Sequence, residues 1–251
     1  MDLGLKDRVY VVTGATRGLG NAAARELVAD GAKVVVTGRD EERATEAAAG
    51  LGPNAVGVAV DNADADAPAR LIAAAREHFG GFDGILVSVG GPPPGFVADT
   101  SDEQWQASFD SVFLGAVRLA RAAAGELEAG GVIGFVLSGS VHEPIPGLTI
   151  SNALRPGLAG FGKSLADELG PRGIRVVGLL PARIDTDRVR ELDGLSADPE
   201  ATRAANESRI PLRRYGTPDE FGRVAAFLLS PAASYLTGIM VPVDGGMRHG
   251  F

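Results

Sequence analysis

The sequence predicts a single α/β domain built on a doubly wound, parallel seven-stranded sheet with helices on both faces. Short β-branched runs such as Lys33–Thr37 and Ile174–Leu180 alternate with longer segments rich in alanine, leucine and charge. The runs are apolar throughout, which is typical of parallel strands buried on both faces. Together these patterns favour a Rossmann fold, in which ligands bind beyond the carboxyl ends of the strands.

The size and composition of the chain agree with one globular domain. It has 251 residues, of which 45% are hydrophobic and 22% charged. A chain of this length buries roughly 70–75% of its unfolded surface, so a single core supports it. No linker or internal repeat divides the sequence, and we expect one domain over residues 1–251. No apolar run approaches the ~18 residues of a membrane span and the N-terminus lacks a signal-peptide pattern, so we expect a cytoplasmic protein without membrane association.

Several function classes are disfavoured by composition alone. The chain contains no cysteine, so disulfides, thiolate nucleophiles and cysteine-ligated metals are excluded. Its three histidines are scattered, and we expect no metal site. The net charge is −8 and no cluster of lysine and arginine occurs, which argues against a nucleic-acid partner.

The strands and helices alternate in order along the chain. The first strand, Val9–Thr13, is followed by a glycine-rich turn and a helix over Asn21–Asp30, with Gly31 as its stop. Further apolar runs predict strands at Lys33–Thr37, Ala55–Val60, Asp83–Ser88, Val132–Ser138, Ile174–Leu180 and Gly238–Val243. Segments rich in alanine, leucine and charge between them predict helices at Glu41–Ala49, Asp64–Phe79, Ser101–Glu128 (one helix or two), Ile150–Leu169 and Pro218–Leu229.

The least regular part of the sequence is the segment 181–216, here named the lid segment. It has mixed charge and several residues that break helices. It leaves the sixth strand at its carboxyl end, where a Rossmann fold binds its ligands. We therefore expect it to form a mobile substrate lid. Asp185, Asp187 and Glu191 resemble a metal cluster, but surface charge on the lid is the better interpretation.

The turn after the first strand has the pattern of a phosphate-binding loop. Thr13–Gly20 reads TGATRGLG and opens the first helix. Glycines permit a tight turn and a close approach of pyrophosphate, and the helix N-terminus supplies N–H donors. A plain glycine-rich turn is the alternative, but the strand–turn–helix context favours a dinucleotide. The candidate contacts in this turn are Gly14, Thr16, Arg17, Gly18, Leu19 and Gly20.

The spacing Gly-x-x-x-Gly-x-Gly resembles the signature of the short-chain dehydrogenase/reductase family, and the resemblance covers essentially the whole chain. The segments 218–221 (PDEF) and 236–246 also match. The segments 90–95 (GGPPPG), 143–148 (EPIPGL) and 151–155 (SNALR) are similar to an atypical branch related to 3-oxoacyl-acyl-carrier-protein reductases. The resemblance implies further cofactor contacts at Asp61, Asn62, Gly90, Pro181, Ile184 and Thr186.

The residues after the second strand bear on which dinucleotide binds. NAD enzymes carry an acid about 20 residues after the glycine-rich turn, whereas NADP enzymes carry a nearby arginine. Gly38 occupies the position of the acid and Arg39 follows it. With Arg17, two guanidinium groups suit a 2′-phosphate. Two solvated surface arginines are the alternative, and Asp40 is close enough in sequence to reach the ribose. We expect a preference for NADP(H) over NAD(H).

The catalytic positions implied by the resemblance are mostly altered. Family members use Ser, Tyr and Lys with a supporting Asn. Ser138 stands in the Ser position, but Ser151 stands in the Tyr position, Arg155 in the Lys position and Val112 in the Asn position. The tyrosines of the chain occur elsewhere, at Tyr10, Tyr215 and Tyr235. A positioned general acid contributes roughly 10²–10⁴-fold to the rate, so carbonyl reduction by the family's mechanism is expected to be slow or absent.

Two substitutes for the missing phenol are open. His142 follows Ser138 by four residues in a loop expected to face the cleft, and its ordinary pKa near 6.5 suits proton donation, with Glu143 able to orient it. An exposed loop histidine is the more ordinary interpretation. Alternatively, Ser138 and Arg155 polarise a substrate oxyanion without transferring a proton, because the ordinary pKa of arginine is above about 12.

The sequence leaves two function classes open. The first is a divergent NADP(H)-dependent oxidoreductase acting on a carbonyl or alcohol of a small-molecule substrate. The second is a non-catalytic NADP(H)-binding protein, such as a sensor or an accessory subunit. The resemblance also implies a homotetramer or homodimer.

Overall fold

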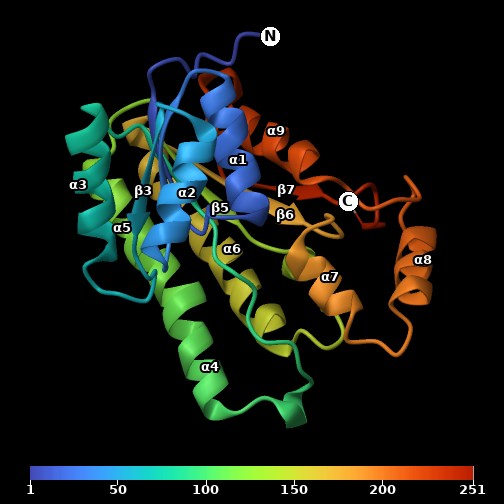
Figure 1. The fold of residues 1–251 in the computed structure, drawn as a ribbon. Coiled ribbons are helices and arrows are strands. Elements are labelled where there is room, and N and C mark those ends of the chain that lie inside the picture. Colours follow the sequence, from blue (N-terminus) through green and yellow to red (C-terminus); the bar gives the residue numbers. More distant parts are fainter. Residues whose placement is uncertain (251) are drawn as a thin grey trace.

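The structure is a computed structural model that describes residues 1–250. At its centre is one parallel seven-stranded sheet in the order β3-β2-β1-β4-β5-β6-β7 (Figure 1). The direction of winding reverses between β1 and β4, which creates the crevice where doubly wound folds bind ligands. The strands are β1 (Val9–Val12), β2 (Lys33–Gly38), β3 (Ala55–Ala59), β4 (Gly84–Val87), β5 (Val132–Val136), β6 (Arg175–Pro181) and β7 (Ile239–Val243).

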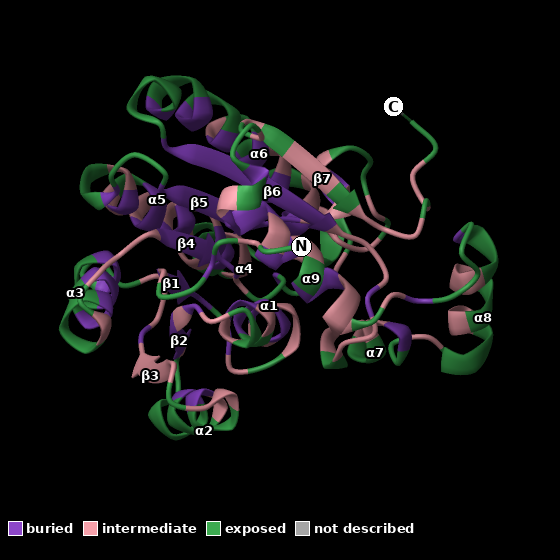
Figure 2. Cartoon of the chain, turned by 90° about the horizontal axis from the view of Figure 1, so that it is seen from above, coloured by how far each residue is buried: buried purple, intermediate pink, exposed green. Residues whose placement is uncertain are grey.

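Helices cover both faces of this sheet (Figure 2). One face carries α1 (Gly18–Ala29), α2 (Glu41–Leu51) and α9 (Pro218–Leu229), and α1 packs against α9. The other face carries α3 (Ala67–Phe79), α5 (Gly115–Glu126) and α6 (Thr149–Leu169). The predicted fold class, a single-domain Rossmann fold with a parallel seven-stranded sheet, is confirmed.

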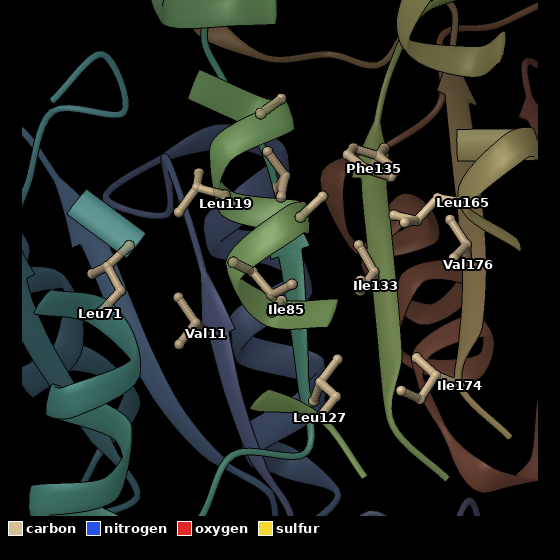
Figure 3. Close-up of a cluster of buried hydrophobic side chains, with 14 of the residues drawn as sticks. Val11, Leu71, Ile85, Leu119, Leu127, Ile133, Phe135, Leu165, Ile174 and Val176 are labelled. Carbon is tan, nitrogen blue, oxygen red and sulfur yellow. The ribbon is translucent and has the colours of Figure 1, made fainter. Parts of the chain in front are cut away.

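The core has two apolar layers because successive strand residues point to opposite faces. Tyr10 and Val12 of β1 belong to the layer under α1 and α9, whereas Val11 between them belongs to the layer under α3, α5 and α6. Figure 3 shows this second layer, in which Val11 and Ile85 lie near Leu71 of α3 and Leu119 of α5, whereas Val176 lies near Leu165 of α6. Each fully buried valine, leucine, isoleucine or phenylalanine side chain contributes roughly 1.5–3 kcal/mol to the stability of the fold.

The predicted helical region Ser101–Glu128 is divided into three parts. It contains α4 (Asp102–Ser108), a π-helical segment at Phe109–Leu114 and α5. Ser101 begins α4 with a capping box, in which its hydroxyl accepts from the amide of Gln104. Gly115 begins α5 directly against the β3–α3 loop, where a Cβ would lie 2.3 Å from the carbonyl oxygen of Asn62. A side chain there would push α5 away from the crevice.

The lid segment contains more regular structure than its composition suggests. It holds α7 (Asp187–Asp193) and α8 (Pro199–Arg209). The side chains of Thr186 and Asp198 cap the N-termini of the two helices. A parallel bridge between Ile184 and Gly216 closes the base of the segment. Local capping groups therefore order both helices, although the composition of the segment shows no strong apolar period.

Several element boundaries differ by one to three residues from the sequence prediction, and two of them lie at the site. Helix α1 begins at Gly18, three residues before the predicted start, so the glycine-rich turn includes its first turn. Strand β5 ends at Val136, which leaves Ser138 in the loop that follows. Among residues 1–250, no helix has the length and apolar character required to cross a bilayer.

We expect Gly14→Ala to lower the free energy of unfolding by about 2–4 kcal/mol, since Gly14 has a φ of 55° and an added Cβ would meet the carbonyl oxygen of Ser88 at 2.5 Å. Urea denaturation followed by circular dichroism measures this. The control is Gly50→Ala in α2, where open space surrounds the position; we expect no loss, or a gain of up to about 1 kcal/mol. Equal effects of both substitutions would contradict the role assigned to Gly14.

Candidate functional site

The glycine-rich turn between β1 and α1 is packed on its inner side and open on its outer side. Gly14 adjoins the backbone of Ser88, and a Cβ on Gly20 would lie 2.5 Å from the carbonyl oxygen of Gly14. Gly18 has a φ of 60° and only open space where its Cβ would be. The turn is therefore open at Gly18, where α1 begins and its first backbone N–H groups lack intrahelical partners.

The neighbouring strand ends are tied together by Thr13. Its hydroxyl donates to the carbonyl oxygen of Ser88 at 2.8 Å and accepts from the amide of Ser88 at 2.9 Å. The side-chain Nδ2 of Asn62 donates to the same hydroxyl at 3.4 Å. Asp61 lies beside Asn62, and its carboxylate accepts from the amide of Ala63 at 2.9 Å. These contacts bring the ends of β1, β3 and β4 to one crevice, with Gly90 exposed beyond β4.

The end of β2 has no free acid side chain pointing at the turn. A Cβ on Gly38 would lie 2.5 Å from Cγ2 of Thr16, so the turn packs where a longer side chain would stand. Asp40 caps α2 and accepts from the amide of Arg43 at 2.9 Å. Arg39 is exposed beside it. One carboxylate oxygen of Asp40 is thus committed to the helix cap.

A cavity of about 450 Å³ opens between the turn and α2. It is lined by Thr16, Arg17, Arg43, Glu46 and Ala47. Two guanidinium groups face this cavity against a single carboxylate, which suits a small anion. Arg43 was not predicted as a site residue. In the sequence, Arg43 follows Arg39 by four residues. This spacing alone does not place Arg43 near the glycine-rich turn; the packing of α2 beside the turn does.

Three serines meet beyond the carboxyl end of β5. The hydroxyl of Ser138 accepts from the amide of Ser140 at 3.1 Å. The hydroxyls of Ser140 and Ser151 lie 3.4 Å apart, and both side chains are buried. The hydroxyl hydrogen of Ser138 is left to donate to a ligand in the crevice. Ser151, by contrast, is directed at Ser140.

Arg155 is buried one helical turn after Ser151. Its Nη1 donates to the carbonyl oxygen of Val136 at 2.6 Å and its Nη2 to that of Val89 at 3.1 Å. Burial lowers the pKa of Arg155 to about 10, so the group stays charged at neutral pH. The two Nη groups thereby hold the ends of β4 and β5 together.

Val112 lies in the π-helical segment and is buried against Ile150 and Leu154 of α6. Val89, Trp105 and Phe113 pack around the same cluster. An apolar side chain neither donates nor accepts hydrogen bonds, so Val112 offers no side-chain partner for a water.

Known proteins resemble this chain over most of its length. A family model described as enoyl-(acyl carrier protein) reductase matches residues 14–248. An L-rhamnose 1-dehydrogenase (NAD(P)(+)) of Azotobacter vinelandii is 36% identical, with 97% of each chain covered. The chain belongs to the short-chain dehydrogenase/reductase family. The 3-oxoacyl-[acyl-carrier-protein] reductase MabA of Mycobacterium bovis is also similar to this chain. The two are 34% identical, and the match covers 97% of this chain and 94% of MabA.

Solved structures of the family share the whole fold. A short-chain dehydrogenase/reductase from Brucella melitensis, described as a glucose/ribitol dehydrogenase, has a TM-score of 0.92 at 30% identity, covering 100% of both chains. L-Sorbose reductase from Gluconobacter frateurii, solved with NADPH and L-sorbose, has a TM-score of 0.90 at 30% identity, again covering 100% of both chains.

The tyrosines of this short-chain dehydrogenase/reductase lie in other parts of the structure than Ser138. Tyr10 is buried in β1, where its hydroxyl donates to the carbonyl oxygen of Leu229 at 3.2 Å and burial raises its pKa to about 12. The Tyr215 hydroxyl donates to Asp193 at 2.8 Å. Tyr235 is fully exposed, before β7.

The loop carrying His142 is ordered by a residue that was not predicted. The side chain of Asn152 accepts from the amide of Ile145 at 3.0 Å and donates to its carbonyl oxygen at 2.9 Å. The amide of Gly95 donates to Gly147 at 2.7 Å, which joins this loop to the proline-rich loop after β4. His142 itself is exposed, and its partial burial and the nearby Arg248 lower its pKa below the ordinary value of 6.5.

The predicted contacts after β6 lie at the base of the lid segment. The amide of Ala182, next to Pro181, donates to Val243 at 3.2 Å. Ile184 is buried and forms the bridge to Gly216. The hydroxyl of Thr186 accepts from the amide of Val189 at 3.4 Å as the cap of α7. The bridge returns the chain to the end of β6, so these residues form the base of the lid segment.

The acidic residues of the lid segment pair with arginines. Asp185 pairs with Arg190 and Arg203, and Glu191 with Arg188. In residues 1–250, no group of three or more histidine, aspartate or glutamate side chains has an arrangement that could hold a metal ion.

We expect Arg155→Met to lower the free energy of unfolding by about 2–4 kcal/mol, because the carbonyl oxygens of Val136 and Val89 lose a charged donor. Arg155→Lys should restore only part of the loss, since an ammonium cannot reach both strands as a planar fork does. Chemical denaturation of both variants measures this, with the exposed Arg121→Met on α5 as the control. Full rescue by lysine would contradict a two-strand clamp.

Proposed function

We propose that the protein is an NADP(H)-dependent oxidoreductase that acts on the carbonyl or alcohol of a small-molecule substrate. Relatives and structural neighbours bearing oxidoreductase names support the reaction class. The observation that carries the cofactor preference is the cavity between the glycine-rich turn and α2. Arg17, Arg43 and Thr16 line this cavity together.

The residues around the turn fit a dinucleotide. The open position at Gly18 and the first N–H groups of α1 suit a pyrophosphate, and the crevice at Asp61, Asn62 and Gly90 suits the adenine and ribose. Gly38 leaves no acid for a 2′-hydroxyl, and Asp40 is engaged as a helix cap. Arg17, Arg39 and Arg43 would then bind the 2′-phosphate. When bound, the nicotinamide would supply or accept the hydride.

The catalytic groups of the proposal depart from the family pattern. Ser138 holds the substrate oxygen through its free hydroxyl hydrogen. Ser151 replaces the phenol with a hydroxyl of far higher pKa, and it is engaged with Ser140. Arg155 donates to two backbone oxygens and stays charged, so it supplies positive potential but no proton relay. We therefore propose a degenerate tetrad and a low rate of carbonyl reduction.

His142 is the proposed proton donor of the active enzyme. It lies one residue after the short turn Gly139–Val141 that follows Ser138. Its exposure lets it exchange protons with solvent, and Glu143 follows it directly. A lowered pKa makes His142 a stronger acid when protonated, but reduces the protonated fraction at neutral pH.

The second candidate function is NADP(H) binding without turnover, as in a sensor or accessory subunit. The specific observation in its favour is that both Nη groups of Arg155 are used between β4 and β5, while Val112 closes the adjoining wall with apolar atoms. Tight NADPH binding without oxidation at 340 nm across a broad carbonyl panel would favour this candidate.

Two further features belong to the proposal. The lid segment 181–216 would cover the substrate, since its Asp187 contacts Arg17 and its Arg188 contacts Pro92. The protein would act in the cytoplasm as a homodimer or homotetramer, as the family resemblance implies.

The cofactor preference predicts an asymmetric effect of removing the cavity arginines. Arg17→Gln combined with Arg43→Gln should raise the Kd for NADP⁺ by about tenfold or more, because charge-assisted hydrogen bonds to the 2′-phosphate are lost. The Kd for NAD⁺ should change far less. Calorimetric titration of both dinucleotides measures this, with Arg121→Gln as the control. Tighter binding of NAD⁺ than of NADP⁺ by the unaltered protein would defeat the proposal.

The proposed role of His142 as proton donor predicts how the rate of carbonyl reduction depends on pH. If carbonyl reduction uses protonated His142, the rate should fall as pH rises through a value below 6.5, since only the protonated form donates. His142→Ala should remove this dependence and abolish turnover. NADPH oxidation across pH measures both, and an unchanged rate in His142→Ala would exclude His142.

A further inference from the structure

The lid segment is joined to the glycine-rich turn by a chain of alternating charges. Asp187 lies 3.4 Å from Arg17 of the turn and 3.4 Å from Arg190. Arg190 pairs with Asp185 at 2.8 Å, and Asp185 pairs with Arg203 of α8 at 3.3 Å. The chain of charges therefore runs from the phosphate-binding turn, across α7, to α8.

The far end of α7 is fixed by a buried carboxylate. Asp193 is only 6% exposed and accepts from Arg183 at 2.8 Å and from the Tyr215 hydroxyl at 2.8 Å. The guanidinium of Arg203 lies 4.5 Å above the Tyr215 ring. Removing one partner of a buried charged network is costly, so the position of α7 is strongly determined. Asp187 is consequently presented to Arg17 by an anchored helix.

A second contact holds the same turn of α7 from the opposite wall of the crevice. Nη2 of Arg188 donates to the carbonyl oxygen of Pro92 at 2.8 Å, and its guanidinium lies against Gly91. Asp187 and Arg188 thus link the lid segment to the loops after β1 and after β4. A dinucleotide that occupies the crevice lies between these two loops.

We propose that Asp187 is a specificity-determining residue that competes with the 2′-phosphate of NADP(H) for the guanidinium of Arg17. The inference rests on the proposed function, in which Arg17 binds that phosphate. Arg17 turns from Asp187 to the phosphate when NADP(H) binds, and the first turn of α7 is released from the glycine-rich turn. NAD(H) has no 2′-phosphate and leaves the contact between Arg17 and Asp187 in place. Occupation by NADP(H) is thereby coupled to the lid segment.

The electrostatics set the size of the effect. Arg17 and Asp187 are mostly exposed, with 67% and 57% of their side chains accessible. An exposed pair of this kind changes an equilibrium by about two- to fivefold. The carboxylate also repels the pyrophosphate common to both dinucleotides, and this part of the effect is equal for the two. The ratio of the two dissociation constants isolates the competition for Arg17.

Calorimetric titration of the full chain with NADP⁺ and with NAD⁺ tests the proposal. Asp187→Asn should lower the Kd for NADP⁺ by about two- to fivefold and lower the Kd for NAD⁺ less, so that the preference for NADP⁺ rises. The matched control is Glu200→Gln, which removes one negative charge from exposed α8 of the same segment. This control should leave the preference unchanged.

A double-mutant cycle assigns the effect to Arg17. In an Arg17→Gln background, Asp187→Asn should no longer change the preference. Amide hydrogen exchange in residues 187–193 gives a readout independent of turnover: NADP⁺ should accelerate exchange at the start of α7, and NAD⁺ should not.

The outcomes separate this inference from the proposed function. Equal or tighter binding of NAD⁺ by the unaltered protein, with no effect of Arg17→Gln, would overturn the cofactor assignment itself. A preference for NADP⁺ that depends on Arg17 but is unchanged by Asp187→Asn would overturn the competition alone.

Discussion

The junction of β1 and β4 is the contact on which the site depends. Thr13 binds both backbone groups of Ser88, and Gly14 fits against the same carbonyl oxygen only because it lacks a Cβ. The junction lies where the sheet reverses its winding. It positions the glycine-rich turn on one side and Val89, a partner of Arg155, on the other. The glycine-rich turn and a buried cation therefore share one backbone framework.

Two polar side chains at the crevice, Arg155 and Ser151, have their hydrogen-bond partners within the protein. Arg155 serves two carbonyl oxygens, Ser151 meets Ser140, and Val112 joins an apolar cluster. In a low-dielectric interior, unpaired polar groups are costly, so these contacts help to hold the ends of β4 and β5 in place.

Arginine has different tasks at different depths in this protein. Buried Arg155 and Arg175 donate to backbone carbonyl oxygens, in the latter case those of Leu228 and Ser230. Half-buried Arg183 holds the carboxylate of Asp193. Exposed Arg17 and Arg43 face a cavity. The planar guanidinium allows all three uses, because it keeps its charge and offers several donors in fixed directions.

The sequence by itself determined the fold class and the glycine-rich turn, because strand and helix periodicity and turn glycines are local properties. The positions assigned to Ser138, Ser151 and Arg155 came from the resemblance to the family. Only the tertiary structure decided what those side chains touch. The partners of Arg155 are 19 and 66 residues away in the chain, and those of Asp193 lie on three segments. Arg43 and Asp187 gained meaning only when α2 and α7 were seen beside the same turn. Contacts of this kind arise from packing between distant segments, and spacing along the chain does not encode them.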